Sequence, residues 1–420
     1  MTDPYFSTIN GEMHAEDLPL SNIAERFGTP VFVYSKAALA DVYRALDAAF
    51  GATPHLICYA MKANSHLAIL NLFARLGAGF DIVSGGELAR VIAAGGDPGK
   101  VVFSGVGKAV AEMRQALDAG VFCFNVESEA ELDRLNAVAG AMGKIVPVSL
   151  RVNPDVDAKT HPYISTGLKG NKFGIPIGAA LPLYRKARAM LNLRVTGIDC
   201  HIGSQITEVA PLLEALEKML VLADRLAGEG IRLSHIDAGG GLGIKYHDEA
   251  PPAMADYIGA LTEAMRGRPE KLLIEPGRLL VGNAGVLLTR VEYLKPTPAK
   301  NFAIVDAAMN DLIRPALYDA YQHIRPVTNE ALQAGTYDVV GPVCESADFL
   351  GRERHLAIRA GSLLAIMSAG AYGSVMSSNY NSRGRAAEVL VDGGTAHLIT
   401  RRESIADLFA REQIVESLKI

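Results

Sequence analysis

The sequence predicts an α/β protein with two domains, a (β/α)8 barrel and a second, mostly β domain. From residue 31 to about residue 285, short apolar runs alternate with amphipathic segments, and such alternation indicates parallel βα units. About eight units fill a barrel of roughly 250 residues. We therefore expect a barrel at 31–285 and a β domain at 286–420 together with residues 1–30. Alternation alone leaves an open, doubly wound sheet as the alternative.

Nine apolar or β-branched runs predict the strands of the first domain. They are VFVYS (31–35), HLICYAM (55–61), GFDIVS (79–84), VVFSG (101–105), FCFNVE (122–127), IVPVSLRVNP (145–154), VTGIDCHIGS (195–204), LSHIDAGGG (233–241) and LLIEPGR (272–278).

Helical segments lie between these runs. Apolar residues recur at three-to-four spacing through Lys36–Phe50, which indicates an amphipathic helix. Ser128 followed by Glu131 is typical of a capping box at a helix start. Pro211 is expected to open a further long helix, Leu212–Ala227, with the same period.

The character of the sequence changes after residue 285. The runs VLLTRVEYLK, FAIVDAA, YDVVGPV, GSLLAIM and AAEVLVDGG are β-like and are separated by Gly, Pro and Asn. A clear helical pattern returns only at Ile405–Phe409. These features predict a mostly β domain.

Composition restricts the class of protein. The formal net charge of −5 does not favour a nucleic-acid partner. The most apolar stretch, Leu272–Val291, is interrupted by charged residues, so we expect no membrane span, and the acidic N-terminus does not resemble a signal peptide. Four cysteines without a CxxC pair fit a reducing cytoplasm. The ten histidines show no ligand spacing, so we expect no metal.

Lys62 lies in the string YAMKAN, directly after an apolar run that predicts a buried strand. Desolvation at the edge of a core lowers the pKa of a lysine and exposes its nucleophilic form. Taken alone, the string fits an ordinary lysine at a strand end equally well.

Other polar residues also lie at or near the carboxyl ends of predicted strands, where a βα barrel carries its active site. They are Asp81, Ser84, Arg151, Asn153, His201, Ser204, the glycines 239–241, Glu275, Gly277 and Arg278. In a barrel these side chains converge on one pocket.

The glycine run GGGLG (239–243) lacks the third glycine of a dinucleotide fingerprint, and no helix is predicted directly after it. Glycines still allow backbone N–H groups to approach a phosphate. The string SGVGKA (104–109) is not a Walker A loop. A lysine, a phosphate-binding glycine run and a carboxylate on one barrel mouth suggest pyridoxal phosphate, whose ring accepts electrons when its nitrogen is protonated.

At this point the chain resembles a known family. The strings YAMKAN, FDIVSGGEL, HIGSQ, GGGLG, EPGR, GPVCESADFL and SAGAYG, in this order, are similar to those of the decarboxylases of basic amino acids that share the alanine racemase-like fold type III. The segments HPYISTGLKGNKFGI (161–175) and CESADFL most closely resemble the branch that acts on meso-diaminopimelate. The likeness runs from about residue 20 to the C-terminus.

The resemblance implies a role for individual residues. Lys62 matches the lysine that binds the cofactor as a Schiff base, Glu275 the partner of the pyridine nitrogen, and His201 the imidazole stacked on the ring. Cys344 matches a proton donor supplied by the second subunit of a homodimer. The remaining implied cofactor contacts are Asp81, Arg151, Ser204, Gly240, Gly241, Gly277, Arg278 and Tyr372.

The implied substrate contacts are Arg278, Arg314, Tyr318, Glu345 and Tyr372. Arginines bind a carboxylate in a bidentate manner, and a glutamate pairs with an ammonium group. The reaction that the resemblance implies is decarboxylation of meso-2,6-diaminopimelate at its D-centre to give L-lysine and CO2, the last step of lysine biosynthesis. The alternatives are a decarboxylase of ornithine, arginine or carboxynorspermidine, a racemase of the same fold, and an inactive relative that binds partners.

Overall fold

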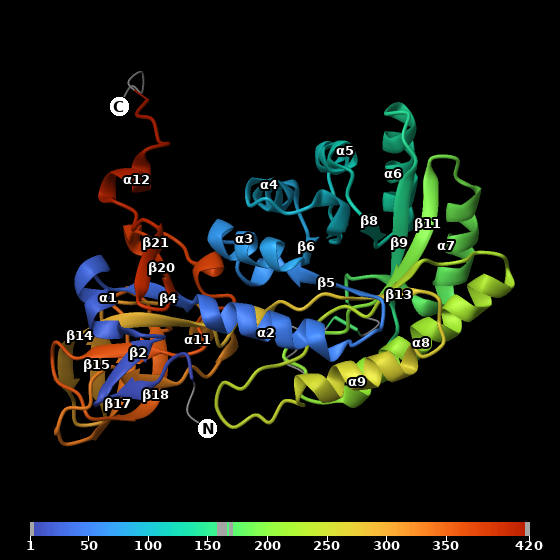
Figure 1. The fold of residues 1–420 in the computed structure, drawn as a ribbon. Helices are drawn as coiled ribbons and strands as arrows, with labels where there is room; N and C mark the ends of the chain where they lie inside the picture. Colours follow the sequence, from blue (N-terminus) through green and yellow to red (C-terminus); the bar gives the residue numbers. More distant parts are fainter. Residues whose placement is uncertain (1–3, 158–165, 168–170, 416–420) are drawn as a thin grey trace. The chain divides into compact units, whose positions relative to one another are not determined.

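The structure is a computed structural model that describes residues 4–157, 166–167 and 171–415 (Figure 1). The chain forms two compact units. One unit is Leu39–Val281, and the other combines Met1–Ala38 with Gly282–Ile420.

Eight parallel strands form the first unit. They are β5 (His55–Ala60), β6 (Gly79–Ile82), β7 (Val101–Phe103), β8 (Cys123–Val126), β9 (Val146–Asn153), β11 (Leu193–Asp199), β12 (His235–Asp237) and β13 (Lys271–Ile274). Each strand pairs with the next in this order, and β13 pairs with β5, so the sheet closes. The predicted barrel is confirmed, and the open sheet is excluded. A short strand, β10 (Ile175–Pro176), pairs with β9 alone.

A helix follows every barrel strand, which is why consecutive strands run parallel. In chain order these helices are α3 (Leu67–Leu76), α4 (Gly85–Ala93), α5 (Val110–Ala119), α6 (Glu129–Ala141), α7 (Ile177–Ala189), α8 (Val209–Gly228), α9 (Met254–Ala264) and α10 (Arg278–Val281). Figure 1 shows α3 to α9 ranged along the strands. Two single turns, η1 (Met61–Ala63) and η2 (Pro98–Lys100), precede α3 and β7.

Two predicted helix starts can be compared with the structure. Ser128 precedes α6 and accepts a hydrogen bond from the backbone N–H of Glu131, so the predicted helix start is confirmed. The reciprocal bond of the predicted capping box is replaced, because the Glu131 carboxylate accepts from the N–H of Glu127. Pro211 lies in the first turn of α8, where its missing N–H costs nothing. Ser84, which we expected at the barrel mouth, accepts from the Glu87 N–H and caps α4.

The second unit is mostly β, as predicted. Its large sheet contains β4 (Val31–Ser35), β14 (Gly285–Pro296), β15 (Asn301–Val305), β16 (Ile324–Pro326), β17 (Gly335–Val340), β18 (Phe349–Leu356), β19 (Leu363–Ile366), β20 (Ala387–Asp392) and β21 (Thr395–Thr400). A small antiparallel sheet holds β1 (Thr8–Ile9), β2 (Glu12–Ala15) and β3 (Leu18–Pro19). The helices are α1 (Leu20–Phe27), α2 (Lys36–Ala49), which continues into the barrel unit, α11 (Arg314–Tyr318) and α12 (Ile405–Phe409). Two further turns are η4 (Ser374–Met376) and η5 (Tyr380–Ser382).

One strand differs from the sequence-based expectation. The run 31–35 was expected to open the barrel, but as β4 it pairs with β14 and β20 in the second unit. It is buried at all five positions, so it reads as a barrel strand, and α2 follows it as in a βα unit. Its partners lie more than 250 residues away in the sequence, and no local pattern specifies them. The compact units accordingly divide at Ala38 and Val281 rather than at residues 30 and 285.

Within the described residues, no helix combines the length and the apolar character that a membrane crossing requires.

Candidate active site

The carboxyl ends of the barrel strands bring the predicted amine and a carboxylate together. Lys62 lies in η1, directly after β5, and Asp81 lies in the neighbouring strand β6. The Lys62 Nζ donates to Asp81 Oδ2 at 2.8 Å. The Lys62 side chain is 38% exposed, whereas that of Asp81 is fully buried. The amine is therefore oriented by a buried partner and still accessible, as an attachment lysine must be.

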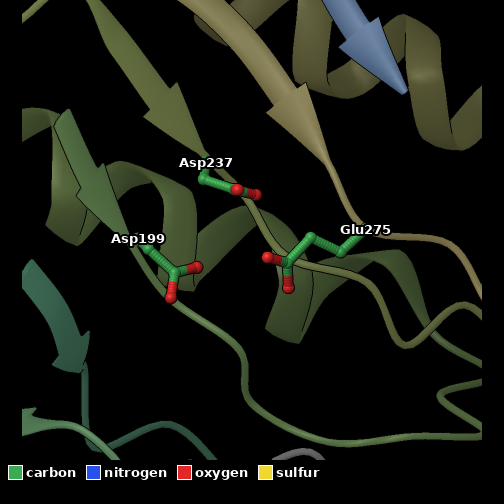
Figure 2. Close-up of side chains that lie close together, drawn as sticks. All are labelled: Asp199, Asp237 and Glu275. Carbon is green, nitrogen blue, oxygen red and sulfur yellow. The ribbon is translucent and has the colours of Figure 1, made fainter. Parts of the chain in front are cut away.

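Three further carboxyl groups meet at this end of the barrel. Asp199 and Asp237 are the last residues of β11 and β12, and Glu275 follows β13. One oxygen from each lies within 4.8 Å of the others. Figure 2 shows the three side chains directed toward a common point. The sequence predicted Glu275 but missed Asp199 and Asp237.

Burial and mutual repulsion favour the protonated forms of these acids. Desolvation raises the pKa of Glu275 well above its ordinary value of 4.5, and the charges of Asp237, Asp81 and Asp199 raise it further. Burial is also the main reason why the pKa of Asp199 rises well above 3.8, and it raises the pKa of Asp237 from 3.8 to about 7. Like charges in a low dielectric cannot all ionise. The cluster therefore retains protons at neutral pH.

Several buried acceptor oxygens at this end of the barrel have no hydrogen-bond partner among the described residues. The Glu275 Oε1 accepts from Asn125 Nδ2 at 3.4 Å and from Ser104 Oγ at 3.5 Å. Among the described residues, Asp81 Oδ1, Asp237 Oδ2 and both carboxylate oxygens of Asp199 are buried without a hydrogen-bond partner. Buried acceptors of this kind need a donor. A protonated ring nitrogen is such a donor, so the residues present fit a pyridoxal ring.

Arg151 provides a second buried cation. Its Nη1 donates to Glu127 Oε1 at 3.2 Å, and its Nε lies 4.0 Å from Asp199 Oδ2. The guanidinium also stands over the ring of Phe173, 5.1 Å from the centroid. Arg151 is thus paired with carboxylates of its own unit. Its contact with the cofactor stays a prediction.

His201 follows β11 and is held by the glycine run. The backbone N–H of Gly240 donates to its Nδ1 at 3.1 Å, which leaves the proton of the neutral ring on Nε2. Burial lowers the pKa of His201 well below 6.5, and the charges of Arg151 and Lys62 lower it further. The imidazole is therefore an uncharged, flat group, suited to stacking on an aromatic ring.

The glycines 239–241 allow three strand-end loops to approach one another. A Cβ on Gly240 would lie 2.0 Å from the carbonyl oxygen of Glu275, and one on Gly239 would lie 2.2 Å from that of Cys200. Gly241 has a φ of +115° and would clash with the Gly203 carbonyl oxygen. The run is thus required by packing, whatever it binds. Its contact with a phosphate stays a prediction, as does that of Gly277.

Arg278 and Ser204 are joined by a hydrogen bond. The Arg278 Nη2 donates to Ser204 Oγ at 3.0 Å, and Nη1 donates to Tyr246 Oη at 2.7 Å. Both predicted residues thus lie together at the mouth. The sequence analysis did not single out Tyr246, which lies in the segment between β12 and α9.

The remaining predicted residues belong to the second unit. Arg314 and Tyr318 are the first and last residues of α11, one turn apart, so they share a helix face. Arg314 is only 6% exposed. Tyr372 has a φ of +55°, a rare conformation for a tyrosine and one that is often found at functional sites.

Cys344 and Glu345 lie in the loop between β17 and β18. The backbone N–H of Cys344 donates to Asn381 Oδ1 at 2.8 Å, and that of Val343 donates to Asp348 Oδ2 at 2.7 Å. The Glu345 side chain is hydrogen-bonded to Tyr380. Cys344 is exposed, whereas the other three cysteines are buried. The loop is therefore anchored while its thiol is presented outward. Asn381 gave no signal in the sequence.

The segment 161–175, which carries part of the sequence resemblance, is described only in part. Residues 161–165 and 168–170 lie outside the described residues.

Comparison with known proteins defines the class. Residues 37–282 match the family described as "Pyridoxal-dependent decarboxylase, pyridoxal binding domain", which is the barrel with its lysine and carboxylates. The fold and this match define a pyridoxal phosphate-dependent decarboxylase of fold type III.

Similar proteins define the branch. A diaminopimelate decarboxylase of Pseudomonas aeruginosa is 60% identical over 98% of this chain and 99% of its own length, and one of Vibrio cholerae is 58% identical over 97% and 98%. The structure of diaminopimelate decarboxylase from M. jannaschii in complex with L-lysine has a TM-score of 0.94 at 37% identity, over 99% of both chains. The chain belongs to the diaminopimelate decarboxylase family.

Proposed function

We propose that this chain decarboxylates meso-2,6-diaminopimelate at its D-centre, with pyridoxal phosphate as cofactor, and releases L-lysine and CO2 as the last step of lysine biosynthesis. The observation that carries the proposal is the barrel mouth, in which an accessible lysine amine and a buried carboxyl cluster follow neighbouring strands. Membership of the family supports the substrate.

The barrel residues would hold the cofactor. Lys62 would bind it covalently, with its Nζ oriented by Asp81. Gly240, Gly241, Gly277 and Ser204 would contact the phosphate, and His201 would cover one face of the ring. When bound, pyridoxal phosphate accepts the electron pair that is left as the substrate carboxylate departs as CO2. Glu275 would face the ring nitrogen and hold the proton there.

The far end of the substrate requires a separate set of charges. After loss of CO2 from the D-centre, the L-centre retains an ammonium and a carboxylate group. Arg278 and Arg314 would bind the carboxylate, Glu345 the ammonium group, and Tyr318 and Tyr372 would complete the contacts. The low exposure of Arg314 favours a strong ion pair with a carboxylate, because water competes less there.

Cys344 would return a proton from its Sγ to the carbon that has lost CO2. We propose that it acts in the barrel of a second copy of the chain, so that the protein is a homodimer with shared active sites. Its exposure and the anchoring of its loop support a role outside its own unit's core. The absence of a metal from the reaction and a cytoplasmic location are part of the proposal, and the four free thiols support the location.

A substrate assay tests the proposal. The purified protein, loaded with pyridoxal phosphate, is given meso-diaminopimelate, and CO2 and lysine are measured. We expect one L-lysine for each CO2. The LL-isomer is the matched control, because it has the same charges but no D-centre, and it should release no CO2. Release of CO2 from ornithine or arginine at a comparable rate would instead favour the alternative decarboxylases.

A further inference from the structure

The mouth of the barrel contains two carboxyl groups to which the proposed reaction assigns no role. Asp199 and Asp237 lie beside Glu275, and their side chains point toward it (Figure 2). The two aspartates are 1% and 0% exposed, and Glu275 is 5% exposed. Burying three acids at this spacing costs folding free energy, so we expect the cluster to have a function.

The cations nearby are already matched by other carboxylates. Lys62 pairs with Asp81, and Arg151 pairs with Glu127. Among the described residues, the closest ion-pair contact with the cluster is the 4.0 Å between Arg151 Nε and Asp199 Oδ2. The cluster is therefore neutralised by protons rather than by side-chain cations.

Asp237 and Glu275 are too close for both to be ionised. An oxygen of each lies within 4.8 Å of the other, and both side chains are buried, so repulsion in a low dielectric leaves a proton on one of the two. The Gly239 N–H donates to Asp237 Oδ1 at 2.9 Å, which favours the negative charge on Asp237. The proton is thereby favoured on Glu275.

We propose that Asp199 and Asp237 are positioning residues that keep Glu275 protonated until the cofactor binds, so that Glu275 supplies the proton of the ring nitrogen. In this step the O–H bond of Glu275 breaks and an N–H bond forms at the ring. A pyridinium then faces a glutamate carboxylate, and neither a proton from solvent nor a co-reactant is needed. The inference rests on the proposed position of Glu275 beside the ring nitrogen.

The other titratable groups that face the cluster do not compete for this role. Burial raises the pKa of the thiols of Cys58, Cys123 and Cys200 well above the ordinary value, so all three stay protonated. His201 and His235 are neutral, because burial lowers the pKa of each imidazole, that of His235 to about 4. Burial also raises the pKa of the hydroxyl groups of Tyr184 and Tyr257 above the ordinary value of 10, so both stay protonated. Among the described residues, the charged groups beside the cluster include Lys62, Asp81, Glu127 and Arg151, which form the two ion pairs named above.

Infrared difference spectroscopy tests the inference directly. The protein is labelled with 13C at the glutamate side-chain carboxyl, and pyridoxal phosphate is added to the cofactor-free chain at pH 7. In the wild type, a carboxylic-acid band of labelled glutamate should be lost and a carboxylate band gained. The change should vanish in Glu275→Gln. In Asp237→Asn and Asp199→Asn it should be weak or absent, because Glu275 is then ionised beforehand.

A control and a second readout complete the test. Asp311 is also buried and has a pKa raised to about 6 by burial, but it lies in the other unit, so Asp311→Asn should retain the wild-type change. In the cofactor-free chain, the Glu275 acid band should titrate at lower pH in Asp237→Asn than in the wild type. This titration does not require a variant that binds the cofactor.

The possible failures are distinguishable. An unchanged signal in Glu275→Gln, with the cofactor still attached, would overturn the proposed place of Glu275 itself. A signal lost in Glu275→Gln but unaltered in both aspartate variants would overturn only the inference about Asp199 and Asp237. A stoichiometric cation in the purified chain that is lost in Asp237→Asn would show that the cluster binds metal, and would overturn it as well.

Discussion

At the scale of single residues, exposure and ion pairing distinguish two lysines that lie near the barrel mouth. Lys62 differs from the buried Lys108, whose side chain is fully enclosed and whose Nζ bonds to Glu131 Oε1 and to two backbone carbonyl oxygens. Lys108 is held by its own fold, whereas Lys62 is 38% exposed and can reach a ligand. This contrast favours Lys62 over Lys108 as the proposed attachment site.

The attachment is testable by reduction. Borohydride should bleach the imine band of the loaded protein and fix the cofactor on Lys62, which peptide mapping by mass spectrometry identifies. Lys62→Ala should abolish the attachment, whereas Lys108→Ala, if folded, should retain it. A label found on another lysine would show that the central assignment is wrong.

The distal arginine can be tested by comparing two substrates. D-lysine is meso-diaminopimelate without the distal carboxylate, so the ratio of kcat/KM for the two reports recognition of that group. Arg314→Ala should lower this ratio by a factor that corresponds to about 2–4 kcal/mol, because the distal carboxylate loses a buried charged partner. Arg352→Ala, an exposed arginine of the same unit, should leave the ratio unchanged. An unaltered ratio in Arg314→Ala would exclude the proposed contact.

At the scale of elements, the barrel could be predicted because its pattern is local. Each of its eight strands is an apolar run followed by a helix, and the sequence shows both. The strand β4 shows the same local pattern, yet it belongs to the other sheet. Packing between segments far apart in the sequence determines which strands pair, and a local hydrophobic pattern does not specify it.

The site could be predicted in part for a related reason. Residues such as Lys62 and Glu275 interrupt apolar runs, and their motifs resemble those of a family. Asp199 and Asp237 lie inside strand-like strings and were not predicted as site residues. The signal was present, because acids that end two neighbouring parallel strands and one that follows the next strand must meet at the same rim. Asn381 is different, since its contact with Cys344 depends on a loop conformation with a φ of 56°.

The glycine run gives a prediction about element packing. In Gly240→Ala the new Cβ would lie 2.0 Å from the Glu275 carbonyl oxygen, so one of the two loops must shift. We expect the affinity for pyridoxal phosphate to fall at least about tenfold, on the order of 1.4 kcal/mol. Gly259→Ala, in helix α9 with open space around its Cβ, should retain the affinity and gain up to about 1 kcal/mol of stability. Equal affinities in the two variants would contradict this packing account. Both are measured by fluorescence titration and thermal unfolding.

At the scale of the whole molecule, the carboxyl cluster affects stability. The pKa of Asp237 is about 7 in the fold against an ordinary 3.8. Between these values the folded chain binds more protons than the unfolded one, so this group makes stability fall as pH rises from about 4 to about 7. His235 acts in the opposite sense, because its pKa is lowered from 6.5 to about 4. The effect of Asp237 therefore has to be measured as a difference between variants.

Thermal unfolding of the cofactor-free chain provides this difference. As pH rises from 5 to 8, Tm of Asp237→Asn should fall less, or rise more, than that of the wild type. The variant should thus gain stability relative to the wild type at the higher pH. Parallel curves for the two proteins would show that Asp237 ionises normally in the fold.

The central claim is that the barrel of one chain and the Cys344 loop of another form a decarboxylase site. Mixing Lys62→Ala with Cys344→Ala subunits tests it most directly. Each homodimer should be nearly inactive toward meso-diaminopimelate. In a mixed dimer, one site carries both lesions and the other carries neither. Random exchange makes half of the dimers mixed, so about a quarter of wild-type activity should return. If exchange is demonstrated by differential labelling and no activity returns, the two residues do not meet across subunits, and the account of a shared site is contradicted.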